Sequence, residues 1–321
     1  MTLVSVVVPT RDRRELLAAT LASILAQTHA ALDVVVVDDG STRIAPDADP
    51  LLDDPRVRLL RSAVPAGVAA ARNRGLEIAR GELIAFCDDD DLWVADKVER
   101  QVAALRGSGR AWSYAPALNV LDSLQPWSLS RGPASWEEGA ILHRNLVPGG
   151  GSAVMATRAA LARVGPFDTT LSQFADWDMW IRLAALGAPA PTREVGVLYR
   201  LHAAQMSADF SGMLDELRAL RRKHRCDRHA PPAGLPPMDG YVVHKMRRAG
   251  ATVQAIGHVL RVSRPAWHRS ALKAIAAVLA YRAGVRRRPL ADAALTRLVA
   301  EVEAVVRNGI RDEARARTAE R

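Results

Sequence analysis

The feature that most constrains the fold is an alternation of short apolar runs and helical patterns within the first 90 residues. Aliphatic residues, many of them β-branched, fill each run, as in strands that are buried on both faces of a parallel sheet. Such strands separated by helices are typical of α/β proteins with crossover connections. The predicted strands cover residues 3–8, 33–37, 57–60 and 82–86, and the predicted helices cover residues 13–27 and 68–80.

The chain changes character near residue 209. Beyond this point the pattern is helical almost throughout, interrupted by a proline-rich stretch at 231–237. We therefore expect an α/β domain at 1–208 and a basic helical region at 209–321. The elements predicted between the first sheet and this boundary are a helix at 93–105, short strands and loops at 111–156, a helix at 176–186 and a strand at 193–201.

The net charge of +9 is unevenly distributed along the 321 residues. Residues 211–321 hold 23 Lys and Arg against 10 Asp and Glu, whereas residues 1–210 carry a small acidic excess. Only four of the 44 basic residues are lysine, a pattern that genome composition bias can produce. The positive net charge therefore does not predict a nucleic-acid partner for the front half of the chain.

The cysteine content and the N-terminal sequence indicate the cellular compartment of the protein. Cys87 and Cys226 are too few for a disulfide framework and lack metal-ligand spacing. The first ten residues have no basic start of a signal peptide, and no window approaches the roughly 18 apolar residues of a membrane span. We expect a cytoplasmic protein that is at most peripheral at the inner face of the membrane.

Polar motifs follow three of the predicted strands directly. Thr10 and Asp12 follow the first strand, Asp38 and Asp39 the second, and the run Asp88–Asp91 the fourth. Open α/β sheets bind ligands at the carboxyl ends of their strands, where these motifs would lie together. This placement predicts a site for a nucleotide-like ligand.

The run Asp88–Asp91 places four carboxylates side by side. Each pair of carboxylates about 4 Å apart costs on the order of 1 kcal/mol even in water, and more where it is partly buried. A hard divalent cation such as Mg²⁺ or Mn²⁺ removes that cost and commonly joins one or two carboxylates to substrate phosphates. The alternative is a solvated acidic turn or a helix cap, but the position after a buried strand favours the metal.

Four motifs together resemble family 2 glycosyltransferases. They read VSVVVPTRDR, VVVVDDGS, ARNRGLEIARGELIAFCDDDDLW and FADWDMWIRL, and they occur in the order and spacing of that family over residues 3–208. The resemblance implies a GT-A fold, a UDP- or dTDP-sugar donor, a divalent metal (Mg²⁺ or Mn²⁺) and inversion at the anomeric carbon.

The resemblance also implies which residues bind the nucleotide. Pro9, Thr10 and Asp12 match the first loop beside the nucleotide, and Asp39 matches the carboxylate that accepts the imide N–H of the nucleobase. Arg72 matches a position near the nucleotide and diphosphate, where a guanidinium provides charge-assisted hydrogen bonds. Taken alone, Arg72 would be interpreted as a surface helix arginine.

Within the acidic run, the family pattern implies that Asp88 or Asp89 faces the ribose and that Asp90 binds the metal. The register is ambiguous, because a third aspartate lies between Asp88 and Asp90. Accessory contacts from Asp89 and Asp91 therefore remain open. Asp38 is interpreted as structural, supporting the turn after its strand.

Tyr199-Arg200-Leu201-His202, followed by Ser207, matches another motif of the family. The match implies that His202 lies near the metal or the diphosphate, because an imidazole can complete a metal shell and an imidazolium can hold phosphate. A purely structural histidine is the alternative.

Asp176 resembles the catalytic base of the family, which takes the proton of the acceptor hydroxyl. It also opens a predicted helix, whose dipole favours a negative charge at that end. Both interpretations are compatible, because the dipole would keep the carboxyl ionised. Many relatives carry an acid where this chain has Ala175, which affects substrate contacts and not the base.

Aromatic and glycine residues near this site have two interpretations each. Trp136, Trp177 and Trp180 are either a platform for an acceptor sugar or core residues. The run Gly149–Gly151 either lets an acceptor approach the backbone or forms a plain flexible loop.

The basic back half contains two further patterns. Residues 252–273 resemble a helix-turn-helix only loosely, because Arg261 and Trp267 stand where smaller residues are usual. Residues 270–288 join an apolar stripe to three arginines, which suits an anionic membrane, a lipid-linked acceptor or a homodimer. For residues 252–273 we favour a helical hairpin that packs on the first domain.

The sequence thus predicts an inverting, metal-dependent glycosyltransferase with a glycan, lipid-linked or small-molecule acceptor. A catalytically inactive nucleotide-sugar binder is the first alternative. A regulatory protein with a DNA-binding C-terminal region is the second, and motif order argues against it, because phosphoacceptor domains place their acidic pair after the first strand.

Overall fold

The structure is a computed structural model, and it describes residues 1–42, 50–202, 212–226 and 292–319. The chain divides into two compact units. The first unit comprises residues 1–136, 147–202 and 289–321, and the second comprises residues 137–146 and 203–288.

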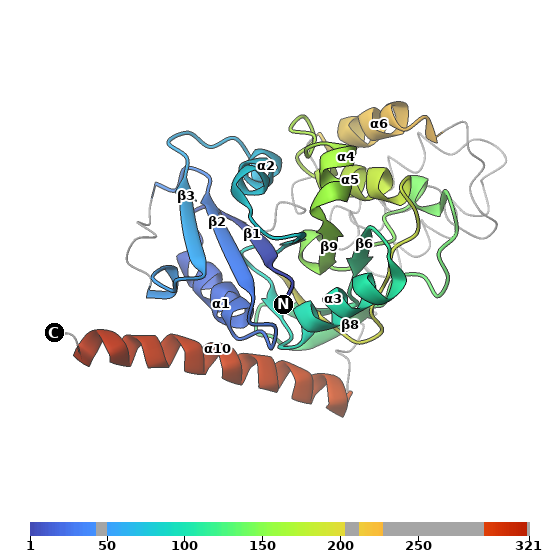
Figure 1. Cartoon of the computed structure of the whole chain (residues 1–321). Helices are drawn as coiled ribbons and strands as arrows, with labels where there is room; N and C mark the ends of the chain where they lie inside the picture. The colour runs from blue at the N-terminus through green and yellow to red at the C-terminus, as the bar shows by residue number, and fades with distance from the viewer. Residues whose placement is uncertain (43–49, 203–211, 227–291, 320–321) are drawn as a thin grey trace, which may run out of the picture. The chain divides into compact units, whose positions relative to one another are not determined.

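A mixed six-stranded sheet forms the centre of the first unit (Figure 1). The strand order is β3 (Val57–Arg61), β2 (Leu32–Asp38), β1 (Val4–Thr10), β4 (Leu83–Phe86), β9 (Val154–Thr157) and β6 (Trp112–Tyr114). The pairs β1–β2, β1–β4 and β2–β3 are parallel, as predicted, whereas β9 runs antiparallel between β4 and β6.

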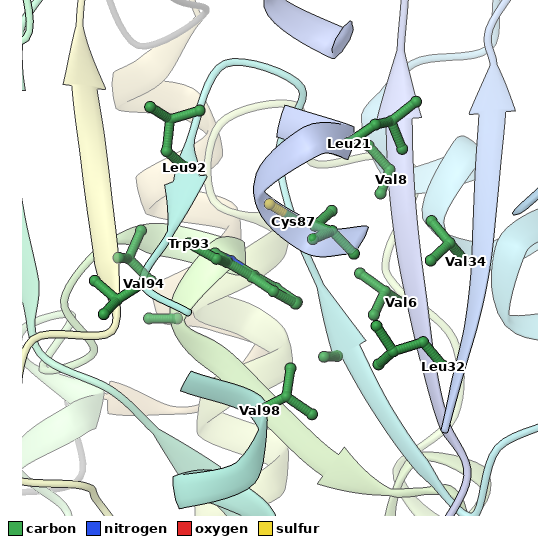
Figure 2. Packing of buried hydrophobic residues seen from close by; sticks show 14 of the residues in the cluster. Val6, Val8, Leu21, Leu32, Val34, Cys87, Leu92, Trp93, Val94 and Val98 are labelled. Atoms are coloured by element: carbon green, nitrogen blue, oxygen red, sulfur yellow. The ribbon is translucent and has the colours of Figure 1, made fainter. Parts of the chain in front are cut away.

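Helices cover both faces of this sheet because successive strand residues point to opposite sides. Val6 and Val8 of β1 belong to one hydrophobic cluster with Leu21 of α1 (Arg14–Leu25), as Figure 2 shows. Val7 faces the other side, where helix α2 (Val68–Ile78) approaches so closely that a Cβ on Gly75 would lie 2.4 Å from the Val7 side chain. The strand segments are apolar on both faces because a helical layer covers each face of the sheet.

A second, four-stranded sheet lies in the same unit, in the order β5 (Leu92–Trp93), β10 (Val197–Leu201), β7 (Ala117–Leu121) and β8 (Pro126–Ser130). The helix predicted at 93–105 is wrong at its start, because α3 runs from Lys97 to Ser108. Trp93 instead pairs with Val197 of β10, and the Val94 amide donates to the Gly196 carbonyl. Pairing with a strand more than 100 residues away thus replaces the first turn of the helix.

Two helices of the first unit follow the strand β9. Helix α4 (Arg158–Val164) is capped by Thr157, whose hydroxyl accepts the Ala160 amide. Helix α5 (Ala175–Ala184) carries Asp176 and Asp178 in its first turn. Two short 3-10 segments lie earlier in the chain: η2 at Pro50–Leu52 and η4 at Gly150–Ala153.

The long helix α10 (Ala293–Ala319) runs alongside α1 (Figure 1). Val299, Val302 and Val306, one apolar stripe of α10, belong to the same hydrophobic cluster as Leu17 and Leu21 of α1. A Cβ on Gly309 would lie 3.3 Å from Ala22, so the two helices approach closely there. The last part of the chain therefore belongs to the packing of the first unit.

The second unit contains η3 (Ala140–Leu142) and α6 (Met213–Lys223) among its described elements. The helix-turn-helix-like residues 252–273, the stripe at 270–288 and Ser207 lie outside the described residues. The division at residues 208 and 209 therefore stays a prediction. No helix in the described ranges has the length and apolar character needed to cross a membrane.

Lys97, at the start of α3, is buried in the first unit with 1% of its surface exposed. Its ammonium lies 3.7 Å from the centre of the Trp93 ring and donates to Gln101 Oε1 at 2.8 Å. Burial lowers the pKa of Lys97 to about 7, because the charged form loses its hydration, while Cys87 nearby opposes the shift. The ring face also favours the charged form, but less strongly than burial opposes it.

Lys97 should make the stability of the protein depend on pH. Between about pH 7 and 10.5 the lysine is neutral in the folded state and charged in the unfolded state, so stability rises with pH. From pH 7 to pH 9 the rise should be about 2 kcal/mol, and Lys97→Met should lack it. Urea unfolding of both proteins at the two pH values measures the difference, and an equal rise in the variant would contradict the assignment.

Candidate functional site

Strand register brings the polar motifs to one edge of the central sheet. Thr10 at the end of β1 lies beside Asp38 at the end of β2, and Pro9 lies beside Val37. β4 is parallel to β1 and ends at Phe86, so the acidic loop that follows it emerges at the same edge. We call residues Asp88–Asp91 the acidic loop.

Asp91 is the structural member of the acidic loop, and its residue is fully buried. Its carboxylate accepts the Ser152 hydroxyl at 2.5 Å and the Arg200 amide at 3.0 Å. Burial, with Asp90 and Asp88 nearby, raises the pKa of Asp91 well above its usual range. The carboxylate is thus turned into the protein, and it holds η4 and β10 to the loop.

Ser152 connects the acidic loop to the glycine run. Its hydroxyl accepts the Asp88 amide at 2.9 Å while it donates to Asp91, and its carbonyl accepts the Trp93 indole N–H at 3.0 Å. These bonds fix the conformation of the loop from both ends. The side chain lies at the end of a glycine run, which is the only signal in the sequence that singles it out.

Asp89 and Asp90 share a cation, Arg13, that was not among the residues predicted for the site. Arg13 Nη1 lies 3.1 Å from Asp89 Oδ1 and 2.9 Å from Asp90 Oδ2. Asp89 also accepts the Thr10 hydroxyl at 2.7 Å. Burial raises the pKa of Asp89 to about 6, and the charge of Asp90 adds to this, whereas Arg13 and Thr10 act in the opposite direction.

His202 lies beside Asp90, the residue to which the resemblance assigns the metal. Its Nε2 atom is 2.9 Å from Asp90 Oδ2, and its side chain is 8% exposed. Asp90 Oδ2 thus contacts both His202 and Arg13. Arg200 adds a hydrogen bond from its Nε atom to the backbone carbonyl of Asp90, at 3.0 Å.

The donor set around Asp90 fits an open divalent-metal site better than a closed cage. Within the described ranges, no group of three or more His, Cys, Asp or Glu side chains is placed to hold an ion. Mg²⁺ and Mn²⁺ do not require such a group, because they use one or two protein ligands together with water and substrate phosphates. Asp90 and His202 meet at a single carboxylate oxygen and suit that role.

Arg72 is brought to the acidic loop by α2. Its Nη2 atom lies 2.5 Å from Asp88 Oδ1, and the Arg72 side chain is 6% exposed. Its guanidinium carbon lies 5.5 Å from the centre of the Phe167 ring. Burial lowers the pKa of Arg72, but Asp88 and Asp176 more than compensate and raise it overall. The Nε atom has no hydrogen-bond partner among the described residues, so this buried cation retains a donor.

Asn73, the neighbour of Arg72, holds the segment that leads to α5. Its side-chain amide donates to the Phe167 carbonyl at 2.9 Å and accepts the Phe167 amide at 2.7 Å. Phe167 in turn packs edge-on against Phe86 with ring centres 5.1 Å apart. The Ala71-Arg72-Asn73 motif therefore positions both a cation and the approach to α5.

Asp176 lies in the first turn of α5, beside the glycine run. A Cβ on Gly150 would lie 3.8 Å from Asp176 Oδ2, and a Cβ on Gly151 would lie 2.9 Å from Arg72 Nη2 and 3.6 Å from Asp88 Oδ1. Asp176, Arg72 and Asp88 thus surround the same short backbone segment. Positive φ angles of 63° and 54° at Gly149 and Gly150 shape this segment, which is the 3-10 turn η4 and its entry.

Asp39 and Asp12 organise the loops at the nucleotide end of the predicted site. Asp39 accepts the backbone amides of Ala66 and Gly67 at 2.9 and 2.8 Å, which holds the loop before α2. Asp12 accepts the Thr42 amide at 2.9 Å and has a φ of 54°. The Asp12 amide also donates to the Ser41 hydroxyl at 2.9 Å, so both aspartates hold loops at the edge where β1 and β2 end.

Asp38 has the structural role predicted for it. One of its oxygens accepts the Ser41 amide at 3.0 Å, and the other accepts Arg61 Nε at 3.2 Å. Of the two interpretations of the tryptophans, the core interpretation holds for Trp177 and Trp180, because both are fully buried. Trp136 is half-buried and packs edge-on against Trp112.

The family model described as "Glycosyl transferase family 2" matches residues 5–171. The chain is 29% identical over 212 residues to the UDP-Glc:alpha-D-GlcNAc-diphosphoundecaprenol beta-1,3-glucosyltransferase WfaP of Escherichia coli, covering 65% of this chain and 81% of WfaP. A second E. coli glucosyltransferase with the same description, WfgD, is 34% identical, but the match spans only 44% of its length.

Solved structures share the fold at low sequence identity. S. aureus TarS 1-349 in complex with UDP-GlcNAc has a TM-score of 0.58 and 14% identity, over 99% of this chain and 92% of that one. The chain spans about half (54%) of the longer TarS structure. The mannosyltransferase PcManGT from Pyrobaculum calidifontis, in complex with GDP-Man and Mn²⁺, has a TM-score of 0.53 and 20% identity, over 98% and 84% of the two chains.

These likenesses show that the chain has a GT-A fold. The family model covers just over half of the chain and includes the acidic loop and the Arg72 motif. The chain belongs to glycosyl transferase family 2.

Proposed function

We propose that this family 2 glycosyltransferase transfers a sugar from a UDP- or dTDP-sugar to an acceptor hydroxyl, with inversion and with a divalent metal. The observation that carries the proposal is the convergence of Asp176, Arg72 and Asp88 on Gly150 and Gly151. This places the proposed carboxylate base, a guanidinium and the acidic loop around one short backbone segment.

Asp176 is the proposed base. It takes the proton of the acceptor hydroxyl while that oxygen forms a bond to the anomeric carbon, and the bond from this carbon to the diphosphate oxygen breaks. The bonding electrons leave with the diphosphate, and attack from the opposite face inverts the configuration. The first turn of α5 supports this role, because a helix N-terminus stabilises the ionised carboxyl that accepts a proton.

Asp90 and His202 would hold the metal, which when bound supplies Lewis-acid stabilisation of the charge on the departing diphosphate. Arg72 would add charge-assisted hydrogen bonds to the same diphosphate. Asp39, Thr10, Pro9 and Asp12 would line the nucleotide, and Asp88 or Asp89 would face the ribose. The Mn²⁺ in the PcManGT complex supports the metal in this fold.

The acceptor that we propose is a glycan linked to a lipid diphosphate. WfaP is named for a UDP-Glc donor and a diphosphoundecaprenol-linked acceptor, and it matches 65% of this chain. A lipid-linked acceptor requires the enzyme to work at the membrane, so we propose a cytoplasmic protein that is peripheral at the inner face. The basic region 209–321 would supply that contact.

A thermal-unfolding screen of nucleotide sugars with Mn²⁺ tests the donor. A UDP- or dTDP-sugar at 100 times its Kd should stabilise the protein by about 2.7 kcal/mol, because only the folded state binds it. UDP and dTDP sugars compared at equal concentration identify the base, and GDP-sugars serve as controls. If no uridine or thymidine nucleotide raises the unfolding temperature, the donor assignment is wrong.

Release of UDP or dTDP from the preferred donor separates the enzyme from an inactive binder. Glycosyltransferases of this kind should release the nucleotide faster when an acceptor is present. A protein that binds the donor tightly but releases no nucleotide with glycan, lipid-linked or small-molecule acceptors would instead support the binding alternative.

A further inference from the structure

Arg13 lies where it competes with a metal for the acidic loop. Its Nη1 atom contacts Asp89 Oδ1 at 3.1 Å and Asp90 Oδ2 at 2.9 Å. The carboxylates are 7% and 10% exposed, whereas the Arg13 side chain is 26% exposed. Arg13 thus neutralises two largely buried charges from a position that is itself partly exposed to solvent.

Arg13 and a bound metal would compete for the same atom, Asp90 Oδ2. It contacts Arg13 Nη1 and His202 Nε2, each at 2.9 Å. A divalent cation held by Asp90 and His202 would lie beside the guanidinium, and the two positive charges would repel each other in a site with little water to screen them. Arg13 and the cation therefore stabilise the same carboxylate and disfavour each other.

Arg13 is also placed to leave the carboxylates. It precedes the first residue of α1 and follows Asp12, whose loop carries the proposed nucleotide contacts. Its long side chain bears a fork of N–H donors that matches a phosphate as well as a carboxylate. A diphosphate bound beside the acidic loop would give the displaced guanidinium a new anionic partner.

We propose that Arg13 is the resident counter-ion of the acidic loop in the donor-free enzyme, and that it makes metal and donor binding cooperative. Without donor, the metal has to displace Arg13 from Asp90 with no compensating contact. With donor, the diphosphate accepts Arg13, and metal affinity rises. This inference rests on the proposed metal site and extends it to the order in which the ligands are taken up.

Mn²⁺ binding measured by the electron paramagnetic resonance signal of free Mn²⁺ tests the inference without any assay of transfer. The full-length proteins are wild type, Arg13→Gln and the control Arg14→Gln, which removes an exposed arginine at the next position. Without UDP, Arg13→Gln should bind Mn²⁺ about tenfold more tightly than wild type, and Arg14→Gln should differ by less than about twofold.

The second arm repeats the titration with saturating UDP. Wild type should gain affinity for Mn²⁺, and Arg13→Gln should gain about tenfold less, because it has no guanidinium to transfer to the diphosphate. Thermal unfolding confirms that each protein is folded, and Arg13→Met, which keeps the aliphatic stem, replaces Arg13→Gln if that variant does not fold.

The outcomes separate the two proposals. Equal or weaker Mn²⁺ binding by the Arg13 variant without UDP, while wild type binds Mn²⁺, overturns the counter-ion role and leaves the metal site intact. Equal gains from UDP in both proteins overturn the cooperativity. A lack of Mn²⁺ binding by every protein, even with UDP, overturns the proposed metal dependence itself.

Discussion

Asp176→Asn is expected to fold and to bind nucleotide sugar normally, yet to lose transfer by about 10² to 10⁴-fold. The amide keeps the size and shape of the carboxyl but cannot accept the proton of the acceptor hydroxyl. Donor affinity should change little, because the carboxylate acts on the acceptor. Initial rates of product formation at saturating donor, with donor affinity measured by calorimetry, separate the two quantities.

Asp178→Asn is the matched control, two residues further along the same turn of α5. Asp178 is fully buried, and its Oδ2 atom accepts both Arg182 Nε and Nη2, at 3.0 and 2.7 Å. Loss of a charge from a buried ion pair costs about 3 kcal/mol, so this variant should lose stability and retain the chemical step. Asp176→Asn should therefore lower the transfer rate with little change in urea unfolding, and Asp178→Asn should lower the free energy of unfolding with little change in the transfer rate.

Near-normal turnover by Asp176→Asn would remove this residue from the mechanism. A large fall in unfolding temperature would also weaken the assignment, because the loss of rate would then reflect damage to the fold. The electrostatic link between Asp176 and Arg72 makes donor affinity the readout to check first.

Asp90→Asn is expected to lower transfer by about 10²-fold or more, since a metal that offsets the charge of the leaving group is worth several kcal/mol. The amide oxygen is a weaker ligand than a carboxylate. Higher Mn²⁺ concentrations should therefore restore part of the rate, and EDTA should abolish the activity of wild type. Rates measured across a Mn²⁺ titration check both points.

Asp91→Asn is the control within the acidic loop. Its carboxylate faces Ser152 and the Arg200 amide in the protein interior, so the Mn²⁺ concentration for half-maximal rate should stay close to that of wild type. Full activity of the wild-type enzyme in EDTA would contradict the assignment of Asp90 as a metal ligand. If Asp91→Asn raises the Mn²⁺ concentration for half-maximal rate and Asp90→Asn does not, the metal ligand is Asp91 and not Asp90.

The sheet of the first unit was predictable because its signal is local. Runs such as DVVVV can be buried only between two helical layers, and the residues that end them define the site edge. Asp90 was a candidate because the acidic run follows a buried strand and matches the family pattern, whereas Arg72 and Asp176 became candidates through the resemblance to family 2 glycosyltransferases. The structure places the polar motifs at one edge, as expected.

Other features depended on contacts between distant segments. The start of α3 was predicted too early. Trp93 fits the apolar periodicity of the helix that follows, but the structure pairs it with Val197 of β10, a contact that the local pattern does not contain. Trp177 and Trp180 have the composition of a sugar platform, and only their burial assigns them to the core. Hydrophobic periodicity cannot distinguish an exposed aromatic from a buried one.

The sequence by itself determined the α/β class, the edge of the sheet that carries the site and the acidic residues that gather there, because burial and strand direction follow from local pattern. Only the tertiary structure decided what each carboxylate does. Asp91 is turned inward by Ser152, and Asp89 and Asp90 share Arg13. Four adjacent aspartates are alike in sequence, and partners that come from residues about 60 to 110 positions away make them different.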